Sequence, residues 1–141
     1  MSVTRLLLTV PVTSLVERPP LFPDLGLGYL ASAVLKAGHK VSIRSWNMNP
    51  SVSDFVNYIK QNSFDVIGIK VFTKDISAAN KTIEIIREVS PRTTVVVGGP
   101  HPSTSSPTEV VLDIPKADFI FRGEARQCII LALNSIRLII S

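Results

Sequence analysis

DVIGIKVF at residues 65–72 and TTVVVGG at residues 93–99 decide the fold of this chain. Each stretch is a short, nearly continuous run of β-branched and other apolar residues that begins with a polar residue. Strands that are covered by helices on both faces read in this way, because neither side of the strand meets water. Residues 65–72 and 93–97 are therefore predicted to be buried strands of a parallel sheet.

Outward from these two strands, strand-like and helix-like segments alternate along the chain. The helix-like segments have apolar residues three or four positions apart, whereas the strand-like segments are short β-branched runs. Further strands are predicted at residues 5–12, 40–46 and 118–121. Helices are predicted over residues 25–36, from Ser51 or Ser53 up to Asn62, from Asp75 or Ser77 to Ser90, at residues 107–112, and from Glu124 onward. This alternation predicts a doubly wound, flavodoxin-like (Rossmann-like) α/β fold with a five-stranded parallel sheet in the order 2-1-3-4-5.

Individual side chains can be placed on this scheme. The residues of the first helix that are expected to face the sheet are Leu27, Leu30, Ala31, Val34 and Leu35. Asp65 and Asp118 each open a predicted strand, so they are expected to be turn or capping residues at the amino edge of the sheet. His39 follows the turn that ends the first helix and is expected to be a solvated surface residue.

The composition is that of one domain, with 141 residues of which 45% are hydrophobic and 18% are charged. It is richer in apolar residues than an isolated domain needs, so some apolar surface is expected to meet a partner. The net charge is +4, but the basic residues are scattered singly, which disfavours nucleic acid as a partner. No apolar run reaches the ~20 residues that span a bilayer, so no membrane span is predicted.

Cys128 is the single cysteine of the chain. An intramolecular disulfide and a cysteine cage for zinc or an iron–sulfur cluster are thereby excluded, and a cytoplasmic location is expected. Residues 1–124 are expected to form the domain. Residues 125–141 are predicted to be an apolar C-terminal helix, either the end of the same domain or a truncated continuation.

A ligand of a doubly wound sheet binds outside the carboxyl ends of the strands, where the strand order reverses. Four segments are predicted to converge there: the proline-rich loop of residues 11–24 with the start of the first helix, and the turns after the third, fourth and fifth strands. The candidate binding residues in these segments are Pro11, Leu25, Gly26, Leu27, Gly28, Val71, Phe72, Thr73, Gly98, Gly99, Pro100, His101, Arg122, Gly123 and Glu124. Gly98 and Gly99 either let a large flat ligand approach the backbone or form a tight turn with positive φ, and the pair alone does not decide between these roles.

Other kinds of site fit the sequence less well. Residues 26–31 match the G-x-G-x-x-A pattern of dinucleotide-binding turns, but they do not follow the first strand directly and no acidic residue ends the second strand. The first strand is followed neither by a flavin-phosphate loop nor by the acidic cluster of a receiver domain. His101 has no second metal ligand beside it, and Glu124 and Asp75 are the obvious acids at the crevice. No catalytic constellation is visible, so a binding domain without catalytic residues is predicted.

Five stretches taken together resemble a known family. They are LGLGYLA at residues 25–31, AGHKV at 37–41, DVIGI at 65–69, VVVGGPHP at 95–102 and ADFIFRGE at 117–124. In this order they are similar to the N-terminal domain of cobalamin-dependent radical SAM proteins, which binds cobalamin (vitamin B12). The resemblance covers most of the chain, up to Glu124.

The resemblance implies a corrin ring that lies flat over the strand ends and contacts the candidate residues, with its nucleotide tail between sheet and helices. In that family the cobalt is thought to carry a methyl group from S-adenosylmethionine to a substrate. The D-x-H-x-x-G motif is absent here, so no histidine is expected on the cobalt. The chain also lacks a CxxxCxxC motif, so the radical SAM chemistry is expected to come from another domain or subunit.

Two other functions remain open from the sequence. One is a degenerate flavodoxin-like domain that acts as a protein-interaction module, including self-association through the apolar residues 125–141. The other is a nucleotide-binding domain that uses Gly26 and Gly28.

Overall fold

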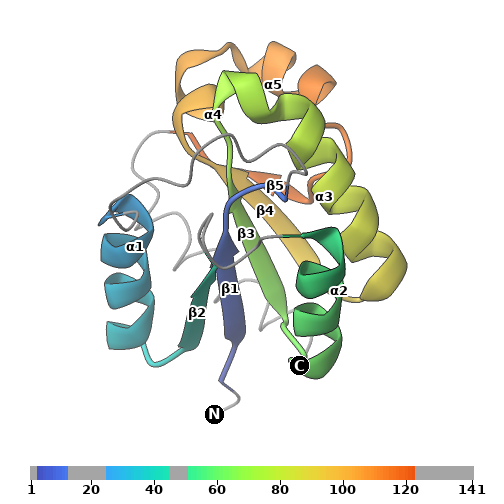
Figure 1. Cartoon of the computed structure of the whole chain (residues 1–141). Helices are drawn as coiled ribbons and strands as arrows, with labels where there is room; N and C mark the ends of the chain where they lie inside the picture. Colours follow the sequence, from blue (N-terminus) through green and yellow to red (C-terminus); the bar gives the residue numbers. More distant parts are fainter. Residues whose placement is uncertain (1–2, 13–24, 45–50, 123–141) are drawn as a thin grey trace.

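The computed structural model describes residues 3–12, 25–44 and 51–122 (Figure 1). Within these residues one sheet is formed by the strands β1 (Arg5–Thr9), β2 (Lys40–Arg44), β3 (Val66–Lys70), β4 (Thr94–Gly98) and β5 (Phe119–Ile120). Neighbouring strands are parallel, and the strand order is β2-β1-β3-β4-β5. The predicted doubly wound topology and its strand order are confirmed.

The described helices are α1 (Leu25–Lys36), α2 (Val52–Gln61), the 3-10 turn η1 (Thr73–Asp75), α3 (Ile76–Val89), α4 (Pro100–Thr104) and α5 (Pro107–Asp113). The predicted bounds of α1 are confirmed. Of the two serines predicted to begin α2, Ser51 is the cap, because its hydroxyl accepts the Asp54 N–H. Ser106 and Glu109 form a capping box that begins α5.

The helices cover the two faces of the sheet separately (Figure 1). α2 and α3 lie on one face, whose buried residues include Leu7, Phe55, Ile67, Ile83 and Val95. α1 lies on the other face, called here the α1 face, whose buried residues include Leu8, Leu27, Val34, Val66 and Val96. Successive residues of a strand thus belong to different clusters, as the two-residue repeat of a β-strand requires.

His39 is buried, with 4% of its surface exposed, so the prediction of a solvated residue is wrong. α1 ends in a Schellman motif, in which Gly38 has a φ of 90° and its N–H bonds to the Leu35 carbonyl. The His39 N–H bonds to the Val34 carbonyl, and the residue at this position packs against the last turn of the helix. Leu35 is 58% exposed and does not join the predicted apolar stripe, since it lies about 100° around the helix from buried Val34.

Several boundaries near the carboxyl ends of the strands differ from the prediction. β3 ends at Lys70 instead of Phe72. The sequence predicts a turn at residues 98–102, but Gly98 ends β4 and Pro100 begins α4, a position that suits a residue without an N–H. β1 ends at Thr9 instead of Val12, because Pro11 cannot donate to the ladder. Residues 13–24 of the predicted loop and the helix predicted from Glu124 lie outside the described residues.

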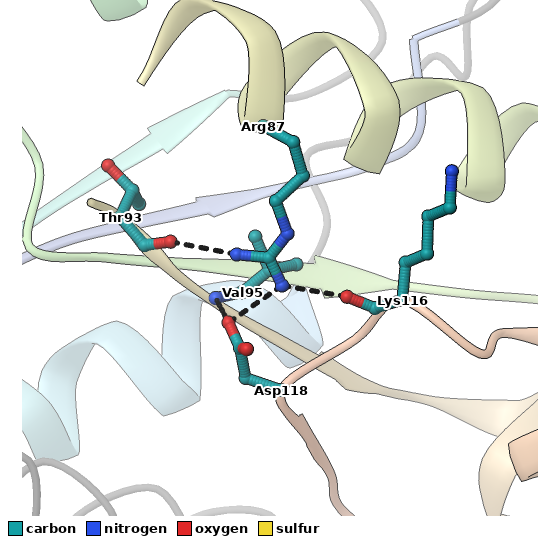
Figure 2. A network of polar contacts seen from close by, with 5 residues as sticks. All are labelled: Arg87, Thr93, Val95, Lys116 and Asp118. Carbon is teal, nitrogen blue, oxygen red and sulfur yellow. Dashed lines mark hydrogen bonds and ion pairs between the residues drawn. The ribbon is translucent and has the colours of Figure 1, made fainter. Parts of the chain in front are cut away.

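A polar network joins three elements at the amino edge of the sheet (Figure 2). The Arg87 guanidinium of α3 donates to the Thr93 carbonyl at 3.2 Å and to the Lys116 carbonyl at 2.7 Å. It also lies 2.8 Å from the Asp118 carboxylate, and the same carboxylate oxygen accepts the Val95 N–H at 2.8 Å. Arg87 therefore connects α3 to the start of β4 and to the segment before β5.

Asp65 repeats part of this arrangement before β3. Its carboxylate accepts the Arg5 N–H of β1 at 2.8 Å, as the Asp118 carboxylate accepts the Val95 N–H of β4. Each aspartate satisfies a backbone donor near the start of a neighbouring strand, so their predicted role as capping residues at the amino edge is confirmed.

Candidate functional site

The segments that follow β1, β3, β4 and β5 lie at one edge of the sheet, called here the carboxyl edge and comprising residues 10–12, 70–75, 98–104 and 121–122. Backbone hydrogen bonds continue past the strands. The Val71 N–H bonds to the Gly98 carbonyl at 2.9 Å, and the Phe121 N–H bonds to the Val97 carbonyl at 2.8 Å. The predicted candidate segments after β3, β4 and β5 are therefore held side by side.

The turn that ends β4 requires a glycine at position 99. Its φ is 107°, a conformation that residues with a side chain rarely adopt. A Cβ atom there would lie 3.0 Å from the Val71 nitrogen and 3.2 Å from the Val71 carbonyl oxygen. Of the two roles that the sequence leaves open for the glycine pair, the tight turn therefore holds for Gly99.

The described residues do not require a glycine at position 98. Its φ is not positive, and an added Cβ would meet the Phe121 Cβ at 3.8 Å, an ordinary van der Waals contact. Gly98 follows Val96 by two residues, so a side chain here would point to the α1 face. The absence of a side chain at Gly98 therefore leaves the backbone open at the carboxyl edge.

Gly28 in α1 is a second glycine that the described chain does not require. No atom lies within 4 Å of an added Cβ there. Glycine inside a helix destabilises it by roughly 0.5–1 kcal/mol relative to alanine, so its presence has no benefit for the helix itself.

Lys70 ends β3 beside Gly98, and the sequence reasoning does not single it out. The two residues are partners in the parallel register. Lys70 follows Val66 by four residues, so its side chain leaves the sheet on the same α1 face. It is half-buried, and its ammonium lies 5.5 Å from the centroid of the Phe72 ring. One lysine in an apolar run forms no motif, and only the strand register shows what lies beside it.

Asp75 is a buried acid at the end of η1, and its surface is 8% exposed. Its Oδ2 atom accepts no hydrogen bond from the part of the chain that the structure describes. Asp75 stands at the N-cap of α3 but makes no side-chain capping bond. A buried acceptor without a donor costs about 1–3 kcal/mol or more, so this position suits a ligand that brings an N–H or O–H group.

The other predicted binding residues differ in what they offer to a ligand. Phe72 and Thr73 are exposed, and Gly26 is exposed at the start of α1. The residues buried within the domain are Pro11, Leu27 and Val71. The side chains of Leu25, Pro100 and His101, and the whole of Gly123 and Glu124, lie outside the description, so their ligand contacts stay predictions.

Arg122 makes contacts within the protein that the sequence does not reveal. Its Nε atom donates to the Pro102 carbonyl and its Nη2 atom to the Ser105 carbonyl, both at 2.9 Å. These two bonds hold α4 against the end of β5. The predicted role of Arg122 in ligand binding is not tested by this arrangement.

Thr82 of α3 determines where the chain runs after β1. Its buried hydroxyl accepts the Val12 N–H at 2.9 Å and donates to the Ala78 carbonyl at 2.7 Å. Two residues earlier, the Asn80 amide donates to the Asp113 carbonyl of α5 at 2.7 Å. The N-terminal half of α3 therefore holds both the chain that follows β1 and the end of α5.

The described part of the carboxyl edge offers several binding groups. They are an open backbone at Gly98, a cation at Lys70, a buried acceptor at Asp75 and an exposed ring at Phe72. Among the described residues, no three His, Cys, Asp or Glu side chains are close enough to hold a metal ion. In the same ranges, none of the helices has the length and apolar character needed to cross a membrane.

Curated relatives of this chain are longer proteins. An uncharacterized methyltransferase of Pyrococcus horikoshii is 32% identical over 127 residues, which cover 88% of this chain and 28% of the relative. The cytidylyl-2-hydroxyethylphosphonate methyltransferase of Streptomyces wedmorensis is 27% identical over 126 residues, which cover 76% of this chain and 23% of the relative. The chain thus spans less than a third of the length of either protein.

Solved structures of proteins with different functions share the fold. The cobalamin-dependent S-adenosylmethionine radical enzyme OxsB matches with a TM-score of 0.68 and 17% identity, over 95% of this chain and 19% of that one. The NtrC4 receiver domain matches with a TM-score of 0.62 and 19% identity, over 94% of both chains. Fold similarity alone therefore does not choose between these functions.

The match to a sequence family separates these possibilities. The family described as B12 binding domain matches residues 12–130, which include the segments after β3, β4 and β5 at the carboxyl edge. This match agrees with the resemblance stated from the five sequence stretches. The chain belongs to the B12 binding domain family.

Proposed function

We propose that this domain binds a cobalamin at the carboxyl edge. The observation that carries the proposal is the open backbone at Gly98, where the described chain does not require a glycine. The family resemblance implies a flat corrin ring over the strand ends, and such a ring needs close approach to the backbone. A side chain at Gly98 would occupy that space.

Other groups at the carboxyl edge suit the same cofactor. Cobalamin carries neutral amide groups around its corrin ring, and their N–H groups are the donors that the Asp75 Oδ2 atom lacks among described residues. The exposed Phe72 ring offers apolar surface to the macrocycle. We assign Gly28, Phe72, Asp75 and Gly98 to holding the cofactor, together with the backbone of the other predicted residues.

The bound cofactor would supply a cobalt centre that accepts and releases a methyl group. The role of this chain is to bind and orient it, without a protein histidine on the cobalt, because the D-x-H-x-x-G motif is absent. The fold match to OxsB, a cobalamin-dependent S-adenosylmethionine radical enzyme, supports a radical SAM domain or subunit as the partner. We also propose a cytoplasmic location, which the single cysteine supports.

Reconstitution with hydroxocobalamin tests the proposal. The protein is incubated with hydroxocobalamin, separated from free ligand by gel filtration and scanned in the visible range. We expect the corrin absorption to elute with the folded protein. Folded protein without corrin absorption, or thermal stabilisation by NAD or FAD in place of cobalamin, would contradict the proposal.

Two glycine variants locate the binding site. Gly98→Ala adds a methyl group that the described chain tolerates, so we expect unchanged stability but roughly five- to hundredfold weaker cobalamin binding, the equivalent of overpacking a contact. Gly38→Ala is the matched control, because Gly38 has a φ of 90° at the end of α1, away from the carboxyl edge. We expect it to lower stability and leave the cobalamin Kd unchanged. Equal effects of both variants on Kd would place the ligand elsewhere.

A further inference from the structure

We infer that Lys70 pairs with the phosphodiester of the nucleotide loop of cobalamin, and that the domain thereby selects complete cobalamin over corrinoids without that loop. This inference rests on the proposed function and names a residue that determines ligand specificity at the same site. It arises from the register of β3 and β4, which places a half-buried cation beside the open backbone of Gly98.

The side chain of Lys70 is directed by its surroundings. A Cβ atom on Gly99 would lie 3.0 Å from the Lys70 Cγ atom, so the aliphatic stem runs close over this glycine. The ammonium lies 5.5 Å from the centroid of the Phe72 ring, which follows the end of β3. The stem is therefore packed on the turn, and the charge lies toward the carboxyl edge.

The chemistry of the ligand matches this charge. The groups around the corrin ring are neutral amides, and the phosphodiester that joins the ring to the nucleotide base is the one anionic group of cobalamin. A charge-assisted hydrogen bond from an ammonium to a phosphate is about twice as strong as a neutral one. Partial burial of Lys70 reduces screening by solvent and salt.

Two other described cations near the strand ends are directed elsewhere. The Arg122 guanidinium donates to the carbonyls of Pro102 and Ser105. Arg44 at the end of β2 lies 4.0 Å from the centroid of the Tyr58 ring, which packs on the opposite face of the sheet from Gly98. Of these three cations, Lys70 is the one whose strand position places it directly beside Gly98.

A series of three corrinoids tests the inference by equilibrium titration in excess cyanide, so that both axial ligands of cobalt are the same. The ligands are cobalamin, cobinamide phosphate, which keeps a phosphate without the base, and cobinamide, which has neither. We expect the wild-type protein to bind the first two more tightly than cobinamide. Lys70→Met keeps the apolar stem and removes the charge. We expect it to weaken the binding of the two phosphate-bearing ligands by roughly three- to thirtyfold, which is less than a fully buried charged hydrogen bond contributes because Lys70 is only partly buried. Its affinity for cobinamide stays unchanged.

Three comparisons separate a charge effect from a structural one. Lys70→Arg keeps the preference for phosphate, and Lys40→Met, at the amino end of β2, leaves all three affinities unchanged. Added salt weakens wild-type binding of cobalamin more than that of cobinamide. Equal weakening of all three ligands by Lys70→Met, or no weakening of any, overturns the inference for Lys70 alone. A folded wild-type protein that binds none of the three overturns the proposed function as well.

Discussion

Neighbouring residues of identical type have different roles at the end of β4. Gly99 is required by its own backbone, because its φ is 107° and a Cβ would meet the Val71 backbone at 3.0 Å. Gly98 meets neither condition. The sequence alone could not show which glycine forms the tight turn and which leaves the backbone open, because both roles use the same residue type. Only the dihedral angles and the neighbouring atoms distinguish the two roles.

Gly99→Ala is expected to lower the free energy of unfolding by at least about 2 kcal/mol, since a side chain in a left-handed conformation costs about 1–2 kcal/mol before any clash is added. Urea unfolding followed by circular dichroism measures the change. Gly28→Ala is the matched control, because an added Cβ there meets no atom within 4 Å. It should raise stability by about 0.5–1 kcal/mol through helix propensity. The same urea midpoint for Gly99→Ala and the wild-type protein would show that the turn tolerates a side chain.

At the level of elements, α3 connects the interior of the domain to the carboxyl edge. The Thr82 hydroxyl accepts the Val12 N–H inside the core, at the point where the chain leaves β1. No pattern in the sequence pairs these two residues, which are 70 positions apart.

Thr82→Val is expected to lower the free energy of unfolding by about 1–3 kcal/mol, because it keeps the shape of the side chain and leaves the buried Val12 N–H without its acceptor. Amide hydrogen exchange at Val12 should become faster. Thr82→Ser keeps the hydroxyl, so exchange at Val12 should stay slow even if the lost methyl group reduces stability. Slow exchange at Val12 in the valine variant would mean that another acceptor serves this N–H.

The sequence predicts whole elements better than single side chains. The bounds of α1 and the order of the strands follow from hydrophobic periodicity and from the handedness of crossovers, which depend on many residues at once. The burial of His39 depends on one Schellman turn, and the exposure of Leu35 depends on the rotation of one helix about its axis. The hydrophobic pattern of the sequence resolves neither. At the candidate site, the edge and its glycines were predictable, but Lys70 needed the strand register and Asp75 needed its burial to be noticed.

On the scale of the whole molecule, the two edges of the sheet have different tasks. The amino edge is closed by Asp65, Asp118 and Arg87, which satisfy backbone groups of the protein itself. The carboxyl edge leaves an open backbone at Gly98 and an acceptor at Asp75 that lacks a donor among the described residues. Stability and ligand binding are therefore expected to respond to different substitutions.

Arg87→Met is expected to lower the melting temperature of the free protein by several degrees, because it removes two hydrogen bonds and an ion pair that together stabilise by about 1–2 kcal/mol. The estimate is kept low because the ion pair is partly exposed, at 30% and 39% of the two side chains. Cobalamin at a hundred times its Kd should still add about 2.7 kcal/mol of stability to the variant and to the wild-type protein alike. Calorimetry with and without cobalamin measures both quantities. A smaller ligand increment in the variant would show that the amino edge influences the binding site.

The outer strands of the sheet also govern how one molecule meets another. β5 has two residues, and β2 begins with the exposed Lys40 and ends with Arg44. An outer strand with free N–H and C=O groups is a template to which a strand of another chain can add, and both short length and lysine charge oppose this addition. The short length of β5 and the charges of Lys40 and Arg44 on β2 therefore oppose intermolecular β-pairing, and with it aggregation, along the two borders of the described sheet.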